Sequence, residues 1–146
     1  MEIYRRSWSE AGHAGRGKVM LAFNMFCAPT QQQAVSKAKA DHEHYLQAIS
    51  DGASGWGDGV SSKDYPNYQK MYAALSSENY ESTVAKGTAW IGTPDDISTT
   101  IARYHEECGG FDSASLQINF GAMKREDAEN SLRLFAKEVM PRFAKV

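Results

Sequence analysis

A chain of 146 residues is long enough for one domain with its own hydrophobic core. Its 16 Lys and Arg against 18 Asp and Glu give a formal charge of −2, with no basic stripe that would predict nucleic-acid binding. The longest unbroken apolar run, Val19–Phe23, is far too short to span a membrane. The residues Met1–Arg6 lack the apolar region of a secretory signal, so we expect a cytoplasmic protein.

The first half of the chain predicts a helix, a strand and a second helix. Residues 2–11 carry apolar side chains at roughly helical spacing, and Gly12 follows as a stop signal. Residues 18–26 are apolar on both faces at their centre, which is typical of a strand buried between two layers. Thr30 followed by Gln33 matches a capping box, and the apolar stripe after it predicts a helix to about Ser50.

Residues 51–86 are predicted to form an insertion within a single domain of residues 1–146. Four glycines and three serines in residues 51–62 indicate an exposed, mobile loop. The tyrosine-rich residues 63–86 indicate one or two short helices. Two interpretations remain open for this segment: a lid that would close over a reactive site and keep water away, or a spacer.

The second half alternates strand and helix. Residues 88–91 predict a short strand, after which Thr93 at the N-cap and Pro94 at N1 begin a helix that stops at Gly109–Gly110. Residues 113–120 alternate apolar and polar side chains, and a last helix runs from about Arg125 until Pro141. Such alternation predicts an α/β protein with parallel strands joined by crossover helices.

Three strings in this half resemble the C-terminal part of the luciferase-like flavin monooxygenases. Gly92-Thr93-Pro94-Asp95-Asp96-Ile97 is similar to the family's turn before a helix. Gly110-Phe111-Asp112 with residues 116–121 (Leu-Gln-Ile-Asn-Phe-Gly) is similar to its last barrel strand, and residues 132–143 (LRLFAKEVMPRF) to its C-terminal helix. The resemblance is strongest over residues 86–143, and upstream it rests mainly on the order of the elements.

The resemblance implies a (β/α)₈ TIM barrel of which this chain would hold the last three parallel strands with their crossover helices. It also implies a flavin-dependent monooxygenase or oxidoreductase that acts on a small organic substrate with reduced FMN, or alternatively F420, and O₂. A whole barrel needs about 250 residues. We therefore expect a homo-oligomer, or a partner that supplies the missing strands. The alternative function is a non-catalytic half-barrel that serves in binding or assembly.

In barrel enzymes the site lies at the C-terminal ends of the strands. On that mapping Thr93, Asn119 and Gly121 are the expected cofactor-binding residues, although Thr93 is equally suited to capping a helix. The apolar substrate pocket would be lined by Phe23, Met25, Phe26 and Trp90, for which core packing is the competing interpretation. Gln117, deeper in its strand, is expected to pack. No residue could be assigned as a catalytic acid, base or nucleophile.

No metal site is predicted. His42 and His44 are two positions apart on a helix and point to different sides, so we expect them on a solvated helix face. Cys27 and Cys108 have neither the number nor the spacing of a disulfide framework or a zinc site. Nothing near Cys27 in the sequence would lower its pKa, so an unreactive thiol is expected there.

Overall fold

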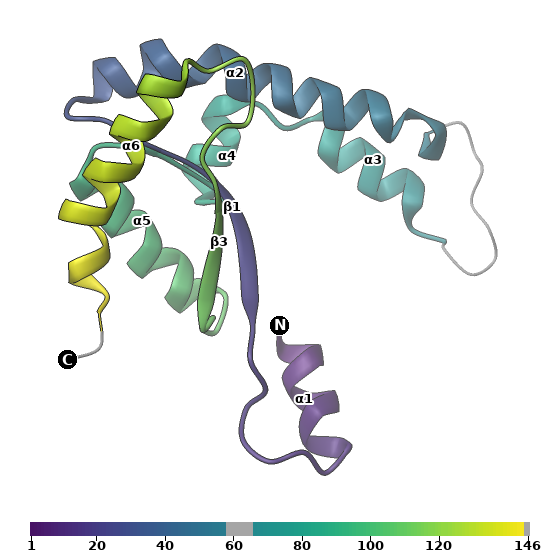
Figure 1. Cartoon of the computed structure of the whole chain (residues 1–146). Coiled ribbons are helices and arrows are strands. Elements are labelled where there is room, and N and C mark those ends of the chain that lie inside the picture. The colour runs from purple at the N-terminus through teal and green to yellow at the C-terminus, as the bar shows by residue number, and fades with distance from the viewer. Residues whose placement is uncertain (58–65, 145–146) are drawn as a thin grey trace.

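The computed structural model of the chain describes residues 1–57 and 66–144. Helices and strands alternate as predicted (Figure 1). In chain order they are α1 (Glu2–Glu10), β1 (Met20–Cys27), α2 (Gln31–Gly52), the 3₁₀ helix η1 (Ser54–Trp56), α3 (Tyr68–Ser76), α4 (Tyr80–Lys86), β2 (Ala89–Gly92), α5 (Pro94–Glu107), β3 (Ser113–Gln117), α6 (Arg125–Glu138) and the 3₁₀ helix η2 (Met140–Arg142).

Two predicted boundaries differ from the structure. Residues 51–56, expected to lie in a loop, instead belong to the end of α2 and to η1 with the turn between them; residues 58–65 of that expected loop lie outside the described part of the chain. The third strand, expected to reach Phe120, ends at Gln117. Beyond that point the chain turns toward α2, where the Asp41 carboxylate accepts a hydrogen bond from the Ala122 backbone N–H at 3.1 Å.

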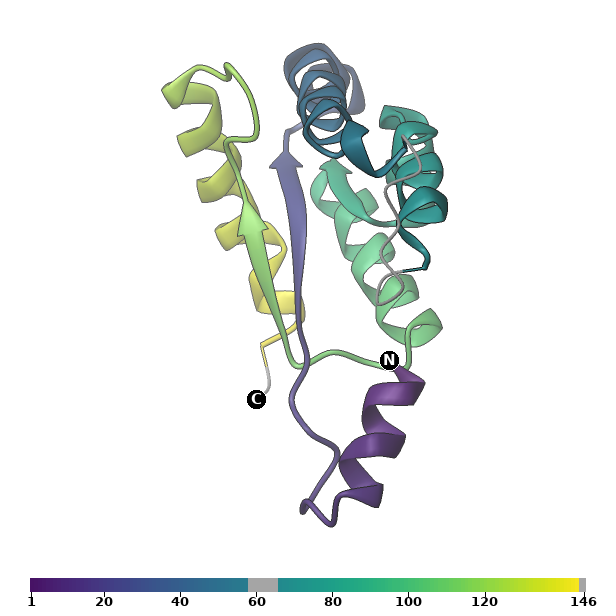
Figure 2. The same cartoon turned by 90° about the vertical axis from the view of Figure 1, so that its right-hand side faces the viewer.

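The three strands form a parallel sheet in the order β2-β1-β3 (Figure 2). Residues Asn24–Cys27 of β1 pair with β2, and residues Met20–Asn24 pair with β3. This confirms the prediction of an α/β protein with parallel strands and crossover helices. The order differs from that of consecutive strands in a (β/α)₈ barrel, where β2 would lie between its neighbours in the chain; here β1 is central and the described strands form an open sheet.

This strand order divides the core into two halves. The connections β1 to β2 and β2 to β3 run in opposite directions along the sheet, so right-handed crossovers put their helices on opposite faces. On one face α2 and α4 pack on Phe26, Ala89 and Ile91. On the other, α5 and α6 pack on a cluster that consists of Phe23, Met25, Cys27, Trp90, Ile97, Ile101, Phe135 and Val139. Helices therefore pack against both faces of the sheet.

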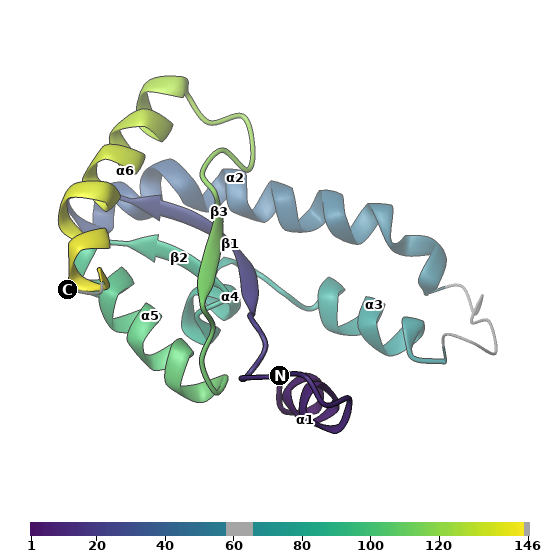
Figure 3. The same ribbon diagram turned by 60° about the horizontal axis from the view of Figure 1, so that its bottom comes forward.

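Two parts of the molecule project from this core. Helix α1 lies apart from the sheet (Figure 3) and buries none of its residues. It is connected through Arg5, which donates to the Gly110 carbonyl at 2.7 Å, and through Arg16 in the following loop, which donates to the Gly109 carbonyl at 2.9 Å. The end of α2 and helix α3 extend together beyond the sheet, where the hydroxyls of Ser50 and Ser76 lie 3.0 Å apart.

Within the described residues, the helices are each too short or too polar to cross a lipid bilayer.

Candidate functional site

A cavity lies on the α2 face of the sheet, where the two strands β1 and β3 run side by side. It has a volume of about 450 Å³, within the usual range for small-molecule sites. Its floor consists of Ala22 and Asn24 of β1 beside Ser115 and Gln117 of β3, which pair across the sheet as Ala22↔Ser115 and Asn24↔Gln117. Alternate residues of a strand point to the same face, so these four share one surface. We call this cavity the sheet groove.

One wall of the sheet groove is α2, with His42, Tyr45 and Leu46. His42 is only 2% exposed, and both of its ring nitrogens have partners. Nδ1 lies 3.2 Å from the side-chain nitrogen of Asn24, and Nε2 lies 2.9 Å from the hydroxyl oxygen of Thr83. Because the amide nitrogen of Asn24 is a donor, Nδ1 accepts and the ring proton is on Nε2, which donates to Thr83.

Thr83 completes this network, since its hydroxyl lies 3.0 Å from the backbone carbonyls of Asn79 and Tyr80 and can donate to either. A neutral imidazole satisfies every hydrogen bond in the series Asn24–His42–Thr83. Burial also lowers the pKa of His42 below its ordinary value, because it disfavours the charged ring. The network therefore holds an uncharged histidine beside the sheet groove.

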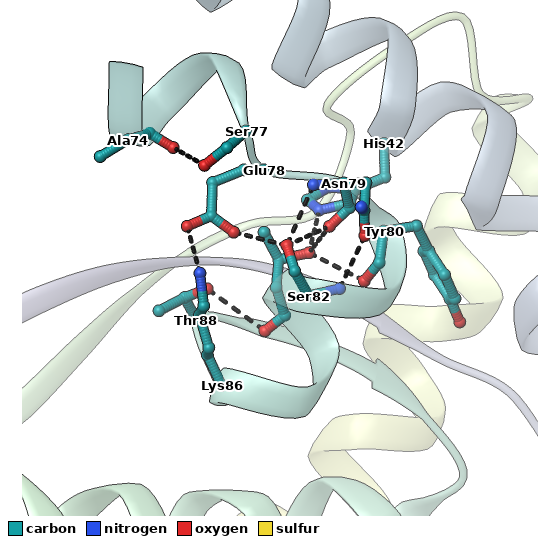
Figure 4. Close-up of polar contacts among 10 residues, drawn as sticks. His42, Ala74, Ser77, Glu78, Asn79, Tyr80, Ser82, Lys86 and Thr88 are labelled. Carbon is teal, nitrogen blue, oxygen red and sulfur yellow. Dashed lines mark hydrogen bonds and ion pairs between the residues drawn. The ribbon is translucent and has the colours of Figure 1, made fainter. Parts of the chain in front are cut away.

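The segment around α4 forms an adjoining wall, with Glu78, Thr83 and Thr88. Figure 4 shows Glu78 and Thr88 in this segment. The Glu78 carboxylate accepts hydrogen bonds from Lys86 Nζ at 2.6 Å and from the Ser82 hydroxyl at 2.5 Å. These two donors hold the pKa of Glu78 below its usual value, with Lys86 the larger cause. The one ionised side chain that lines the groove within the described residues is thus already paired.

The burial of His42 corrects the expectation that it lies on a solvated helix face. The two histidines do point to different sides: His44 is exposed, whereas His42 faces the sheet. The signal that could have placed His42 is its position four residues after Ala38, which itself follows Ala34 by four; both alanines are fully buried. The aromatic rings of Phe120 and Tyr80 lie edge-on to the imidazole at 5.5 and 6.3 Å.

The three expected cofactor-binding residues lie outside the sheet groove. Asn119 and Gly121 are exposed just beyond the end of β3. A side chain at Gly121 would place its Cβ 2.7 Å from Asp41 Cβ, so glycine is required there for close packing on α2. Thr93 caps α5: its side chain accepts from the Asp96 N–H, and its own hydroxyl donates to the Asp96 carboxylate at 2.6 Å. Their role toward a cofactor stays a prediction.

Gln117 differs from its expected packing role, since it is exposed and lines the sheet groove. The four expected pocket residues are all buried. Phe23 lines the sheet groove, but its ring also stacks on Trp90 at 4.1 Å in the core. Phe26 packs with α2 and α4, while Met25 and Trp90 pack against α5 and α6. Whether a substrate contacts any of the four stays a prediction.

A second, smaller cavity of about 130 Å³ lies where β1 ends, between the first halves of α2 and α6. Cys27 lines it. Burial raises the pKa of this thiol to about 11, although nearby Arg142 opposes the shift, so the thiolate is scarce at neutral pH. Ser131 holds the strand end by accepting the Cys27 N–H at 2.8 Å. Across the described ranges no three His, Cys, Asp or Glu side chains come together as metal ligands would.

Comparison with known proteins gives structural neighbours only. No protein-family model and no curated protein sequence matches the chain. It is similar to the monooxygenase RslO1 from Streptomyces bottropensis, with a TM-score of 0.68 and 25% identity over 98% of this chain and 36% of that one. It is also similar in fold to the oxygenating constituent of 3,6-diketocamphane monooxygenase, from the CAM plasmid of Pseudomonas putida. This type II Baeyer–Villiger monooxygenase was solved with FMN, and the match has a TM-score of 0.65 and 22% identity over 97% and 38% of the two chains. The chain thus spans little more than a third of either neighbour.

Proposed function

We propose that this chain is part of a flavin-dependent monooxygenase or oxidoreductase that acts on a small organic substrate. FMN is the proposed cofactor, with F420 as the alternative. The observation that carries the proposal is the superposition of 98% of the chain on a monooxygenase at 25% identity. A second neighbour of the same fold is a monooxygenase in complex with FMN. A bound reduced flavin would supply the electrons for oxygen activation.

The described residues fit a flavin in two respects. The sheet groove has the volume of a small-molecule site, and it offers amide and hydroxyl groups beside aromatic and aliphatic walls. At the C-terminal end of β3, Asn119 and Gly121 are exposed and remain the proposed contacts to the cofactor. Thr93 is proposed with them, although its hydroxyl and its backbone N–H both donate to the Asp96 carboxylate and its carbonyl accepts from the Ile97 N–H.

We further propose that a second copy or another polypeptide completes the fold. The chain covers 36% and 38% of its neighbours, and one edge of β3 has no strand beside it among the described residues. The C-terminal segment, whose helix α6 lies beside β3 in Figure 2, exposes Leu132, Met140 and Phe143 by 42–55%. Open strand edges and exposed apolar side chains favour association. A monodisperse monomer in light scattering would contradict this proposal.

The same exposed features support the second candidate function, a non-catalytic half-barrel that serves in binding or assembly. Titration of the purified chain with FMN, followed by flavin fluorescence, separates the two functions, with F420 as a parallel sample. Saturable quenching at micromolar protein is the result expected of a flavin protein, and oxygen consumption with reduced FMN would then be measured. Unchanged fluorescence with both cofactors would contradict flavin binding by this chain and favour the assembly function.

A further inference from the structure

We propose that the sheet groove binds the uncharged ring system of the flavin, with Asn24 and Gln117 bonding to its polar edge and the phosphate left outside. This inference rests on the proposed function and adds to it a site and a recognition mode. It differs from the expectation that the strand ends alone hold the cofactor. The observations that carry it are the hydrogen-bonding groups of the floor, the charge of the walls and the rigidity of the histidine network.

The floor offers both kinds of hydrogen-bonding group. The Asn24 side-chain nitrogen is used by His42, whereas its oxygen Oδ1 has no hydrogen-bond partner among the described residues. The Gln117 amide and the Ser115 hydroxyl are likewise free within residues 1–57 and 66–144, and Gln117 is paired in register with Asn24. Together they present a row of acceptors and donors on one strip of the sheet. A heteroaromatic ring with carbonyl and N–H groups along one edge complements such a row.

The walls favour an uncharged occupant. His42 is neutral, and Glu78 is bonded to Lys86. No lysine or arginine lines the groove among the described residues, so a phosphate would find no cation there and would face the Glu78 carboxylate. Tyr45 and Leu46 supply aromatic and aliphatic surface against which a planar ring can pack. The groove therefore favours binding of the uncharged ring and offers no cationic side chain to the phosphate.

The Asn24–His42–Thr83 network makes the floor a fixed surface. His42 bonds to the Asn24 nitrogen, and an exchange of the amide's oxygen and nitrogen would require His42 to change its tautomer as well. Oδ1 is therefore held toward the groove as an acceptor, ready to receive a ring N–H. We assign Asn24 and Gln117 as binding residues, and His42 as a positioning residue that acts through Asn24.

The test is a fluorescence titration of the full chain with FMN and, separately, with riboflavin, which has the same ring and no phosphate. Equal dissociation constants within about threefold are expected. Gln117→Ala should weaken both by about fivefold to tenfold, because one hydrogen bond is lost. Ala22→Phe should fill the floor and weaken both by more than tenfold, without removing any hydrogen bond of the fold.

Matched controls are Gln32→Ala, an exposed glutamine of α2, and Met20→Phe, which lies two residues before Ala22 on the same face of β1 and outside the groove. Neither should change binding by more than twofold. If FMN binds the wild-type chain and Ala22→Phe binds it equally well, the groove assignment is overturned while the proposed function stands. FMN binding at least tenfold tighter than riboflavin would also overturn it, because a phosphate contact would then dominate. Failure of both flavins to bind the wild-type chain would overturn the proposed function and this inference together.

Discussion

Replacing His42 tests the structural account most sharply, because the ring is buried and both of its nitrogens are bonded. His42→Ala removes a buried side chain of α2 that contacts β1 and α4. By analogy with other large-to-small core substitutions, this lowers the free energy of unfolding by about 2–4 kcal/mol. The Asn24 N–H is also left without its acceptor, which adds about 1 kcal/mol or more. We expect the free energy of unfolding to fall by about 4 kcal/mol. For a chain of this size the melting temperature should fall by roughly 10 °C.

His42→Phe separates the two contributions, since it keeps a ring of similar size and loses only the hydrogen bonds. It should cost about 1–3 kcal/mol, the penalty for buried polar groups left unpaired. The control is His44→Ala on the exposed side of the same helix, which should stay within about 0.5 kcal/mol of wild type. Urea unfolding followed by circular dichroism measures all three. A His42→Ala variant as stable as His44→Ala would refute the buried network.

Three further predictions follow from the same geometry. Since burial lowers the pKa of His42, the unfolded chain binds a proton that the folded chain resists. The network's contribution to the free energy of unfolding is therefore complete above the ordinary histidine pKa of about 6.5 and is lost as the pH falls below it. Urea unfolding at pH 7.5 and 5.5 should show a smaller decrease in the free energy of unfolding for His42→Phe than for wild type. Equal decreases in the two proteins would count against the network. Iodoacetamide at pH 8 should label Cys108 and spare Cys27, whose thiol is buried with a pKa of about 11; equal labelling of both by mass spectrometry in the folded protein would show that the core at Cys27 is open. Gly121→Ala should destabilise the fold by about 1–3 kcal/mol in urea unfolding, because the new Cβ would overlap Asp41; an unchanged midpoint would mean that the loop does not pack on α2.

Local sequence signals predicted the ends of several helices correctly, because these depend on residues three or four positions apart. Thr93 with Asp96 forms the reciprocal capping box at α5, and Gly109, with φ of 74°, follows the end of that helix. At α2 only one half of the predicted capping box is present, with Thr30 accepting from the Gln33 N–H. These interactions are made within one turn of the chain, so the local sequence contains the information needed.

The sheet order and the sheet groove could not be obtained in the same way. Pairing of Asn24 with Gln117 joins residues far apart in the chain, and alternation of strands and helices is compatible with several strand orders. The burial of His42 does not follow from its neighbours Asp41 and His44, which suggest only a possible metal site. Its partners Asn24 and Thr83 come from other elements, and only its spacing from Ala34 and Ala38 indicated a buried position.

The expected pocket residues show why strand-end aromatics are ambiguous. Phe23, Met25 and Phe26 lie on one buried strand, and successive side chains of that strand face opposite layers. The sequence indicates that such a strand is buried but not which helices cover each face. Trp90 illustrates the same limit, since its indole N–H donates to the nearby Gly87 carbonyl at 3.2 Å within the core.

The most direct test of the central claim is equilibrium dialysis of the purified chain against FMN, with the bound flavin measured by absorbance after release from denatured protein. Saturable binding that approaches one flavin per chain at micromolar protein is expected, with riboflavin reaching the same stoichiometry. Equal flavin concentrations on both sides of the membrane, at protein concentrations where the chain remains folded, would contradict the claim that this chain is a flavin-binding part of an oxidoreductase.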